Sequence, residues 1–287
     1  MSKHNLTLVS FSFVRGGAGI AAQNFLNLAK SFPDFEINQI SQDDAGTFQF
    51  LKRIISWVLG KLQKDGNPTK HSLNLFSYSK LIREFSRNPN NLYHLHWINN
   101  DTLSIYDLDQ IPKFSLITLH DEWFYSGAEH YQKVVEDSGD FTIEYLKNDF
   151  KYGLPWNYWV WKTKLAKLQK RKDLCFTVPS RWMEERSKSS LVLKNNTIHY
   201  LPNCIDTDLF SPLDQNEHLV KRLELGIDEE NFVIGFGAID GTKNPLKGGS
   251  ILFEALSSWI ANKPAESREK IVLLCFGGKM TEEFTSL

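Results

Sequence analysis

The chain has 287 residues, of which 41% are hydrophobic and 23% charged, which is enough apolar material for two domains or one large one. Its 33 Lys and Arg nearly balance its 34 Asp and Glu, and the net charge of -1 argues against a dedicated nucleic-acid binder. Cys175, Cys204 and Cys275 show no metal-ligand spacing, so we expect no metal site and a reducing cytoplasm. No secretory signal or membrane-spanning run is evident.

Short apolar or β-branched runs alternate with stretches of helical period up to about residue 201. The predicted strands are 6–13, 35–40, 92–97, 114–119, 174–178 and 198–201. The predicted helices are 20–31, 48–64, 78–86, 158–171 and 181–190. This alternation predicts an α/β fold with a parallel sheet that is covered by helices on both faces. The segment 121–156 shows no clean period, which is typical of a functional or mobile loop.

A domain boundary is expected near Pro202 to Pro212, so that residues 1–205 form a first domain and residues 206–287 a second. Beyond it the pattern restarts with a strand at 232–238, a helix at 248–261 and a strand at 270–276. Two strands and their helices cannot bury both faces of a parallel sheet. The sequence therefore predicts that the second domain is only partial.

The apolar run 115–119 ends at His120 and Asp121, which Glu122 and Trp123 follow. In open α/β sheets, ligands bind outside the carboxyl ends of the strands. A histidine at such a place donates or accepts a hydrogen bond near neutral pH, and it would orient a hydroxyl or a departing phosphate. The alternative is a structural histidine that caps the strand end.

Two glycine-containing turns precede predicted helices. Gly16 and Gly17 would let the backbone approach an anionic ligand at a helix N-terminus, or would form a simple tight turn; the full G-x-G-x-x-G spacing is absent. Lys247 and Gly248 precede the helix of the second domain and suit a diphosphate. The alternative for this second turn is a solvated charged loop.

The segment 52–64 is basic and amphipathic. Such a helix can lie on an anionic membrane surface. The interpretation that the pattern favours is an ordinary surface helix, which packs Ile54, Val58 and Leu62 on the core. The aromatic segment 156–161 is expected to be an interior helix rather than an acceptor-binding wall.

Six segments, taken in chain order, resemble the retaining nucleotide-sugar glycosyltransferases of family 4, and most closely those that build bacterial capsular polysaccharide, exopolysaccharide or lipopolysaccharide. The segments are Gly16-Gly17-Ala18, His94-Leu-His96-Trp97-Ile-Asn99, Thr118-Leu-His120-Asp121-Glu-Trp123, Val178-Pro-Ser180-Arg-Trp182, Leu201-Pro-Asn203-Cys-Ile-Asp206-Thr-Asp-Leu-Phe210, and Phe236-Gly-Ala followed by Lys247-Gly248. The resemblance implies a GT-B fold, in which two Rossmann-like domains face a cleft. The first domain would hold the acceptor and the second the donor.

The resemblance also implies roles for single residues. Gly16 and Gly17 would lie near the donor phosphates, and His120, with Asp121 beside it, would contact the donor sugar at the reaction centre. Lys247, next to Gly248, would neutralise the leaving diphosphate. Transfer would retain the anomeric configuration and need no metal or other cofactor. The acceptor would be a glycan or a lipid-linked glycan, met in the cytoplasm or at the inner face of the plasma membrane.

The sequence departs from the family pattern at four places. Ala238-Ile239 stands where many relatives have Gly-Arg, and Cys204 replaces a glycine. Gly127-Ala128 carries none of the cysteines that close relatives have there. The Glu-x₇-Glu segment that binds donor sugar and ribose is not among the 287 residues. An inactive acceptor-binding or partner-binding module is therefore an alternative to the transferase, and a GT-B enzyme such as a sugar-nucleotide epimerase is a more remote one.

Overall fold

The computed structural model describes residues 3–132, 144–148, 152–239, 241–243 and 245–285. The chain divides into two compact units, residues 1–207 and 208–287, close to the boundary expected between residues 205 and 206. Much of the segment 121–156, for which function or mobility is predicted, lies outside the described residues, namely 133–143 and 149–151. The two units are described separately below.

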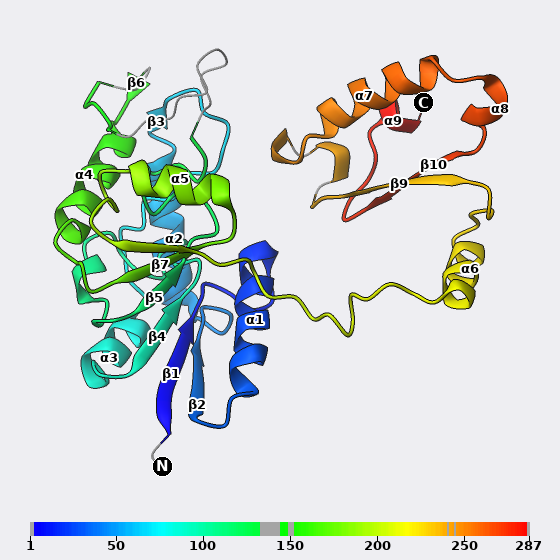
Figure 1. The fold of residues 1–287 in the computed structure, drawn as a ribbon. Coiled ribbons are helices and arrows are strands. Elements are labelled where there is room, and N and C mark those ends of the chain that lie inside the picture. The colour runs from blue at the N-terminus through cyan, green and yellow to red at the C-terminus, as the bar shows by residue number, and fades with distance from the viewer. Residues whose placement is uncertain (1–2, 133–143, 149–151, 240, 244, 286–287) are drawn as a thin grey trace. The chain divides into compact units, whose positions relative to one another are not determined.

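The first unit is built on a six-stranded sheet in which every neighbouring pair of strands runs parallel (Figure 1). Its order is β2-β1-β4-β5-β7-β8. The strands are β1 His4–Val9, β2 Phe35–Ile40, β4 Leu92–Leu95, β5 Leu116–Thr118, β7 Cys175–Val178 and β8 Thr197–Tyr200. The predicted α/β class with a parallel sheet is confirmed, and the unit has a Rossmann-like fold.

The order in which the chain adds strands reverses between β1 and β4. The chain runs outward from β1 to β2 and then crosses back to β4, after which the remaining strands follow in chain order. At such a reversal, adjacent crossover connections leave on opposite faces and open a crevice at the carboxyl ends of the strands. Val9 pairs with Leu95, and Leu95 with Ile117, so β1, β4 and β5 end nearly level there.

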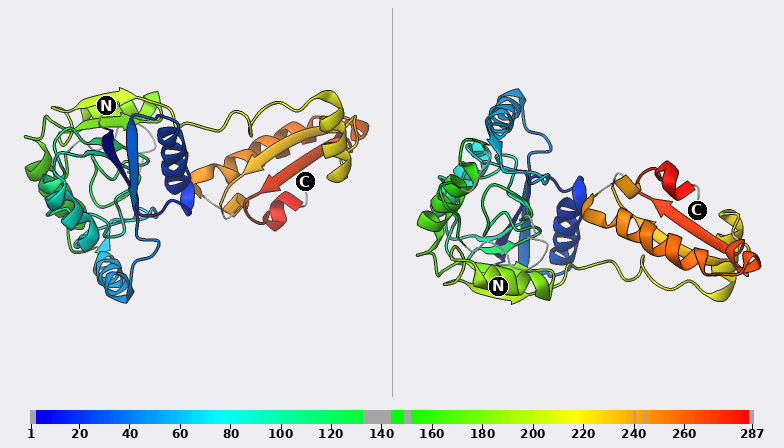
Figure 2. Two further views of the ribbon diagram at one scale, coloured as in Figure 1. Left: turned by 90° about the horizontal axis from the view of Figure 1, so that it is seen from below. Right: turned by 90° about the horizontal axis from the view of Figure 1, so that it is seen from above.

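Helices cover both faces of this sheet (Figure 2). Helix α1, Gly16–Lys30, places Ala22 and Leu26 against Leu8 on one face, and these two helix positions lie one turn apart. Helices α3, Ser79–Arg87, and α4, Trp156–Leu168, pack into the larger core on the other face. A helix over the aromatic segment 156–161 is confirmed, but it is interior only in part: Val160 and Trp161 are buried, whereas Trp159 is 45% exposed.

Helix α2, Thr47–Gly60, contradicts the packing predicted for it. Ile54, Val58 and Leu62 were expected in the core, yet their exposed fractions are 40%, 50% and 48%. The helix turns a polar stripe inward instead. Gln49 Nε2 donates to the backbone oxygen of Asp101 at 2.7 Å, and Ser56 Oγ donates to Asp101 Oδ1 at 2.8 Å. Figure 2 shows α2 projecting from the body of the first unit in both views.

Smaller elements complete the described part of the first unit. Helix α5, Arg181–Ser189, is capped at its N-terminus by Ser180, whose hydroxyl accepts from the backbone N–H of Met183. Strands β3, Gln63–Lys64, and β6, Tyr152–Gly153, form a short antiparallel pair, and η1 spans Leu108–Gln110. No helix of the described residues is long and apolar enough to cross a membrane.

The second unit contains the parallel pair β9, Phe232–Gly237, and β10, Ile271–Phe276 (Figure 1). Its helical elements are α6 Gln215–Glu224, η2 Gly241–Lys243, η3 Pro245–Lys247, α7 Gly249–Ala261, α8 Ala265–Arg268 and α9 Glu282–Thr285. Both predicted strands and the helix α7 are confirmed. Helix α6, which the sequence analysis missed, starts with a reciprocal capping box between Asp214 and Glu217.

Candidate functional site

The carboxyl ends of β1 and β4 are joined by backbone hydrogen bonds at the point where the strand order reverses. The backbone N–H of His96 donates to the carbonyl of Val9 at 2.7 Å, and that of Phe11 donates to the carbonyl of Trp97 at 3.0 Å. His120 follows β5 next to them, and it lines a small cavity together with Trp97 and Asp121. The structure thus brings His120 and Asp121 to the crevice that the strand order creates.

Three histidines form a chain beneath this crevice. His96 Nδ1 lies 2.9 Å from His120 Nε2, and the rings of His94 and His96 lie 4.2 Å apart between centroids. Nε2 of His94 is 2.7 Å from the hydroxyl of Thr118. Burial lowers the pKa of His94 and of His120 to about 4, although the charge of Asp121 raises that of His120. All three rings, including His96, are therefore neutral at pH 7.

The hydrogen-bond network favours one tautomer of this chain. Nε2 of His96 is buried without a partner in the described residues, and an orphaned donor is rarer in buried sites than an under-satisfied acceptor. His96 therefore carries its proton on Nδ1 and donates to Nε2 of His120. The proton of His120 is then on Nδ1, a nitrogen with no hydrogen-bond partner among the described residues. The Nδ1–H of neutral His120 is thus a donor that remains available, on a residue that lines the small cavity.

Asp121 is held by three donors. Its Oδ2 accepts from the indole N–H of Trp97 at 2.7 Å and lies 2.5 Å from Nδ1 of His130, while its Oδ1 accepts from the backbone N–H of Trp123 at 3.1 Å. Burial opposes ionisation, but His130 and the other donors hold the pKa of Asp121 below its usual range. Nε2 of His130 is in turn 2.8 Å from the hydroxyl of Ser72. Asp121 is therefore an ionised carboxylate that its donors hold in one orientation.

A buried charged network fixes the loop that follows. Arg186 of α5 donates to Glu122, and the other carboxylate oxygen of Glu122 accepts from the backbone N–H of Gln132 at 2.6 Å. The ammonium of Lys164 donates to the carbonyls of Trp123 and Gly127. Because buried charges are tolerated only when they are paired or bonded, these contacts specify one conformation of residues 121–132.

Gly16 and Gly17 begin α1 directly after β1 and its turn. Gly16 has φ +73°, a left-handed conformation that favours glycine. A Cβ at either position would meet no heavy atom within 4 Å, so the two glycines leave open space at the helix N-terminus. Gly19 differs, because a Cβ there would lie 2.8 Å from the carbonyl of Ser12. This geometry accommodates both the predicted ligand contact and the plain turn.

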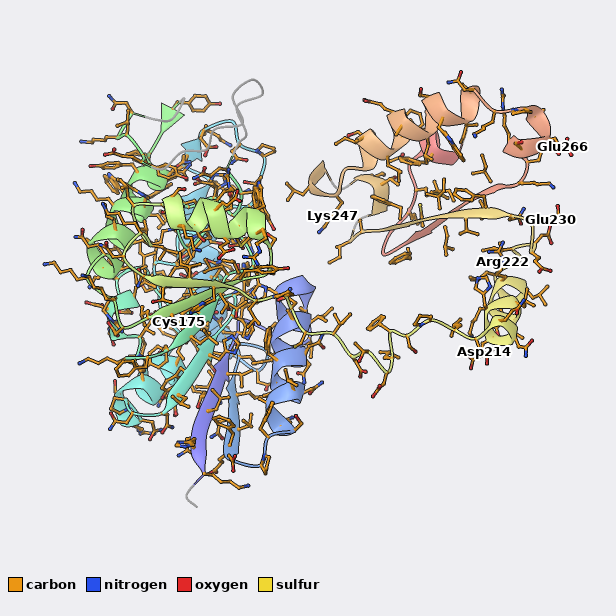
Figure 3. The ribbon with its side chains drawn as sticks, viewed as in Figure 1. Cys175, Asp214, Arg222, Glu230, Lys247 and Glu266 are labelled. Atoms are coloured by element: carbon orange, nitrogen blue, oxygen red, sulfur yellow. The ribbon has the colours of Figure 1, made fainter. Side chains whose placement is uncertain are left out.

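Lys247 and Gly248 belong to the second unit. Lys247 ends η3 and is exposed at the start of α7 (Figure 3). Gly248 caps α7 with φ +72°, again in the left-handed region. Within its unit, the lysine therefore stands at a helix N-terminus, as predicted, where backbone N–H groups and the helix dipole favour an anion.

Five residues around this site were not predicted from the sequence as site residues, namely His94, His96, Trp97, His130 and Ser72. A usable signal exists for the first three: His94 and His96 alternate along one strand that ends beside the predicted β5, and Trp97 follows directly. For His130 and Ser72 we find no such signal, because their contact joins positions 58 apart in the chain.

The described residues contain no group of three or more His, Cys, Asp or Glu that is placed to hold a metal ion. No family model and no curated protein matches the sequence.

Proposed function

We propose that this chain is a glycosyltransferase of the GT-B type, which transfers a sugar from a nucleotide diphosphate sugar to a glycan or a lipid-linked glycan with retention of configuration. The observation that carries the proposal is the neutral N–H donor of His120 beside Trp97 and Asp121, at the strand-order reversal. A sugar needs such a combination, because its hydroxyls bind polar groups and its apolar faces stack on aromatic rings.

In this scheme His120 donates to a hydroxyl of the donor sugar, and Asp121 holds Trp97 and His130 in place around it. Gly16 and Gly17 leave room for the donor phosphates. The bond between the anomeric carbon and the diphosphate oxygen breaks, a bond to the acceptor oxygen forms, and the proton of the acceptor hydroxyl passes to the departing diphosphate. Lys247, with the backbone at Gly248, compensates the negative charge that develops on the leaving diphosphate. The scheme requires no metal.

We also propose peripheral contact with an anionic membrane through α2. At about 100° per residue, its exposed apolar side chains occupy a continuous half of the helix surface. They are Phe48, Phe50, Leu51, Ile54, Ile55, Trp57 and Val58, each at least 40% exposed. Lys52 lies over the ring of Phe48 and Lys61 over that of Trp57. Apolar side chains bordered by cations complement an anionic lipid surface.

The test of the transferase is a panel of nucleotide diphosphate sugars, each measured for binding by calorimetry and for turnover by mass spectrometry with lipid-linked and free glycan acceptors. Donor-dependent extension of an acceptor is the expected result. Acceptor binding without any donor binding would instead establish the alternative, a binding module. Binding of a donor followed by a change in its sugar, with no transfer, would point to an epimerase.

A further inference from the structure

A second cavity, of about 50 Å³, lies between α2 and the neighbouring loops of the first unit. A volume of this size holds a few water molecules or one small anionic group. Its lining includes Arg53, Trp57, Lys70, Ser72, Asn100 and Asp101. The proposed transferase chemistry assigns no role to this cavity.

Two cations face the cavity without a carboxylate partner. Lys70 Nζ donates to Oδ1 of Asn100 at 2.9 Å and lies 4.4 Å from the ring centroid of Trp97. The guanidinium of Arg53 lies 4.8 Å from the ring centroid of Phe11. Among the described residues, the guanidinium of Arg53 forms no hydrogen bond and neither cation forms an ion pair. Most of their N–H donors remain available to a ligand.

The surrounding charges do not neutralise this pair. Desolvation lowers the pKa of Lys70 to about 8; the charge of Asp121 raises it, and the charge of Arg53 lowers it further. Desolvation and the charge of Arg15 lower the pKa of Arg53, although Asp101 opposes them. The cations therefore repel one another, and a bound anion would relieve that repulsion.

Asp101 is the carboxylate in this lining, and its Oδ1 is already engaged. It accepts from the hydroxyl of Ser56 at 2.8 Å and from the backbone N–H of Phe76 at 3.0 Å. These bonds fix Asp101 as the support of α2. The donors that remain, a guanidinium fork and an ammonium, match the tetrahedral oxygens of a phosphate group.

The neighbours of the cavity indicate what else the ligand carries. Trp57 lines it and also belongs to the exposed apolar half of α2, with 63% of its surface exposed. Lys70 stacks on Trp97, whose indole N–H binds Asp121 beside His120. The two cations thus lie near the apolar surface of α2 and also near Trp97 of the candidate sugar site.

We propose that Arg53 and Lys70 bind the phosphate of a lipid-linked acceptor, with the lipid along α2 and the sugar toward Trp97. The identity of this ligand as an acceptor rests on the proposed function, but the phosphate affinity of the pocket does not.

The test is calorimetry on the full chain, without any donor, using farnesyl diphosphate, inorganic diphosphate and farnesol as probes. The variants are Arg53→Gln and Lys70→Gln, with the exposed residues Arg87→Gln and Lys30→Gln as charge-matched controls. Circular dichroism and thermal melting check that each variant is folded. We expect each pocket variant to weaken the binding of both diphosphates at least tenfold, and each control variant to change their binding less than twofold. Farnesol binding should be unaffected.

Lys70→Arg supplies a second readout. Wild-type affinity should fall as the pH rises through about 8, where Lys70 loses its proton, whereas the arginine variant should keep its affinity there. Equal binding of diphosphate by all variants would overturn the phosphate pocket, whether or not transfer is ever observed. If UDP competes with diphosphate in a way that depends on Arg53, the assignment of the pocket to the acceptor would be overturned. Absence of transfer by the wild-type chain, with diphosphate binding that still depends on Arg53 and Lys70, would contradict only the proposed function.

Discussion

The indole N–H of Trp97 and the carboxylate of Asp121 form a 2.7 Å hydrogen bond across the ends of β4 and β5. Asp121 is buried, so this bond satisfies a charge that cannot reach solvent. The same indole ring lies beneath the Lys70 ammonium. Trp97 therefore connects the carboxylate beside His120 to the cationic cavity near α2, and its replacement should affect both stability and ligand binding.

Trp97→Phe keeps an aromatic ring but removes the donor to Asp121. We expect a loss of about 1–3 kcal/mol in unfolding free energy, because a hydrogen bond to a charged group is broken in a buried place. Urea denaturation measures it, with Trp57→Phe on the exposed face of α2 as control, expected within about 0.5 kcal/mol. In a double-mutant cycle with Asp121→Asn the two losses should not add. Full additivity would show that the indole and the carboxylate are energetically independent.

His120→Ala should reduce sugar transfer by roughly a hundredfold or more while the protein stays folded. The reason is the loss of the neutral N–H donor that the histidine chain leaves available at the small cavity. Initial rates with a saturating donor measure the effect, and the exposed His218→Ala of α6 is the control. A variant as active as wild type would return His120 to the role of a strand-end cap.

Acidification should destabilise the first unit between about pH 6.5 and 4. The pKa of His94 is lowered to about 4 in the folded chain, chiefly by burial, from an ordinary value of 6.5. In this window the unfolded chain binds more protons, so stability rises with pH and is lost as the pH falls, by up to roughly 1.4 kcal/mol per pH unit for one such group.

Tryptophan fluorescence during urea unfolding checks this prediction, because of the eight tryptophans only Trp259 lies in the second unit. His94→Gln should make the pH dependence shallower, and His96 and His120, whose pKa values burial also lowers, should keep the rest of it. Thr118→Val, which removes the hydroxyl partner of His94 but not the imidazole, should lower stability at every pH and keep the slope. An unchanged slope in His94→Gln would show that another group is responsible.

Helix α2 should bind vesicles that contain anionic lipid and release them as salt is added. Trp57→Ser with Ile54→Ser should abolish binding without unfolding the chain, because both side chains are largely exposed. Lys61→Gln should weaken it about fivefold, as expected for one cation near the surface. Sedimentation with neutral and anionic vesicles is the measurement. Concentration-dependent dimerisation in place of lipid binding would assign the apolar face to a second copy of the chain.

Lys247→Ala should weaken binding of a nucleoside diphosphate about tenfold or more and leave the nucleoside unaffected, because the lost partner is a phosphate. Calorimetry with UDP and uridine, or the pair that the donor panel selects, compares the two. Lys263→Ala, on the C-terminal side of α7, is the control. Equal losses for both ligands would remove Lys247 from the diphosphate site.

The positions of the main helices and strands follow from periodicity, whereas their ends do not. The strand predicted for residues 6–13 stops at Val9. Phe11 and Phe13 extend the apolar pattern beyond that residue, but the hydroxyl of Ser12 accepts hydrogen bonds from the backbone in a turn there. Periodicity reports residue type and not hydrogen bonding. Helix α6 was missed because only three of its ten residues are apolar, Leu219, Val220 and Leu223, although Asp214 and Glu217 carried the capping signal.

The candidate site was predictable where it follows strand ends and not where it depends on distant contacts. His120 and Asp121 come directly after an apolar run, so the strand-end rule locates them. The orientation of α2 was unpredictable for a different reason. Ser56 and Gln49 find their partner in Asp101, which is distant in the chain, and only that contact turns the apolar half outward.

The strand order also sets a problem for biosynthesis. Strand β1 is made before the other strands of its sheet, yet it lies between β2 and β4, and the sheet lacks its last strand until β8 has emerged. At ~5–20 residues per second, synthesis of the 207-residue first unit takes roughly 10–40 s. During that interval the nascent chain exposes strand edges with apolar side chains, so its yield in cells should depend on chaperones that shield them before release.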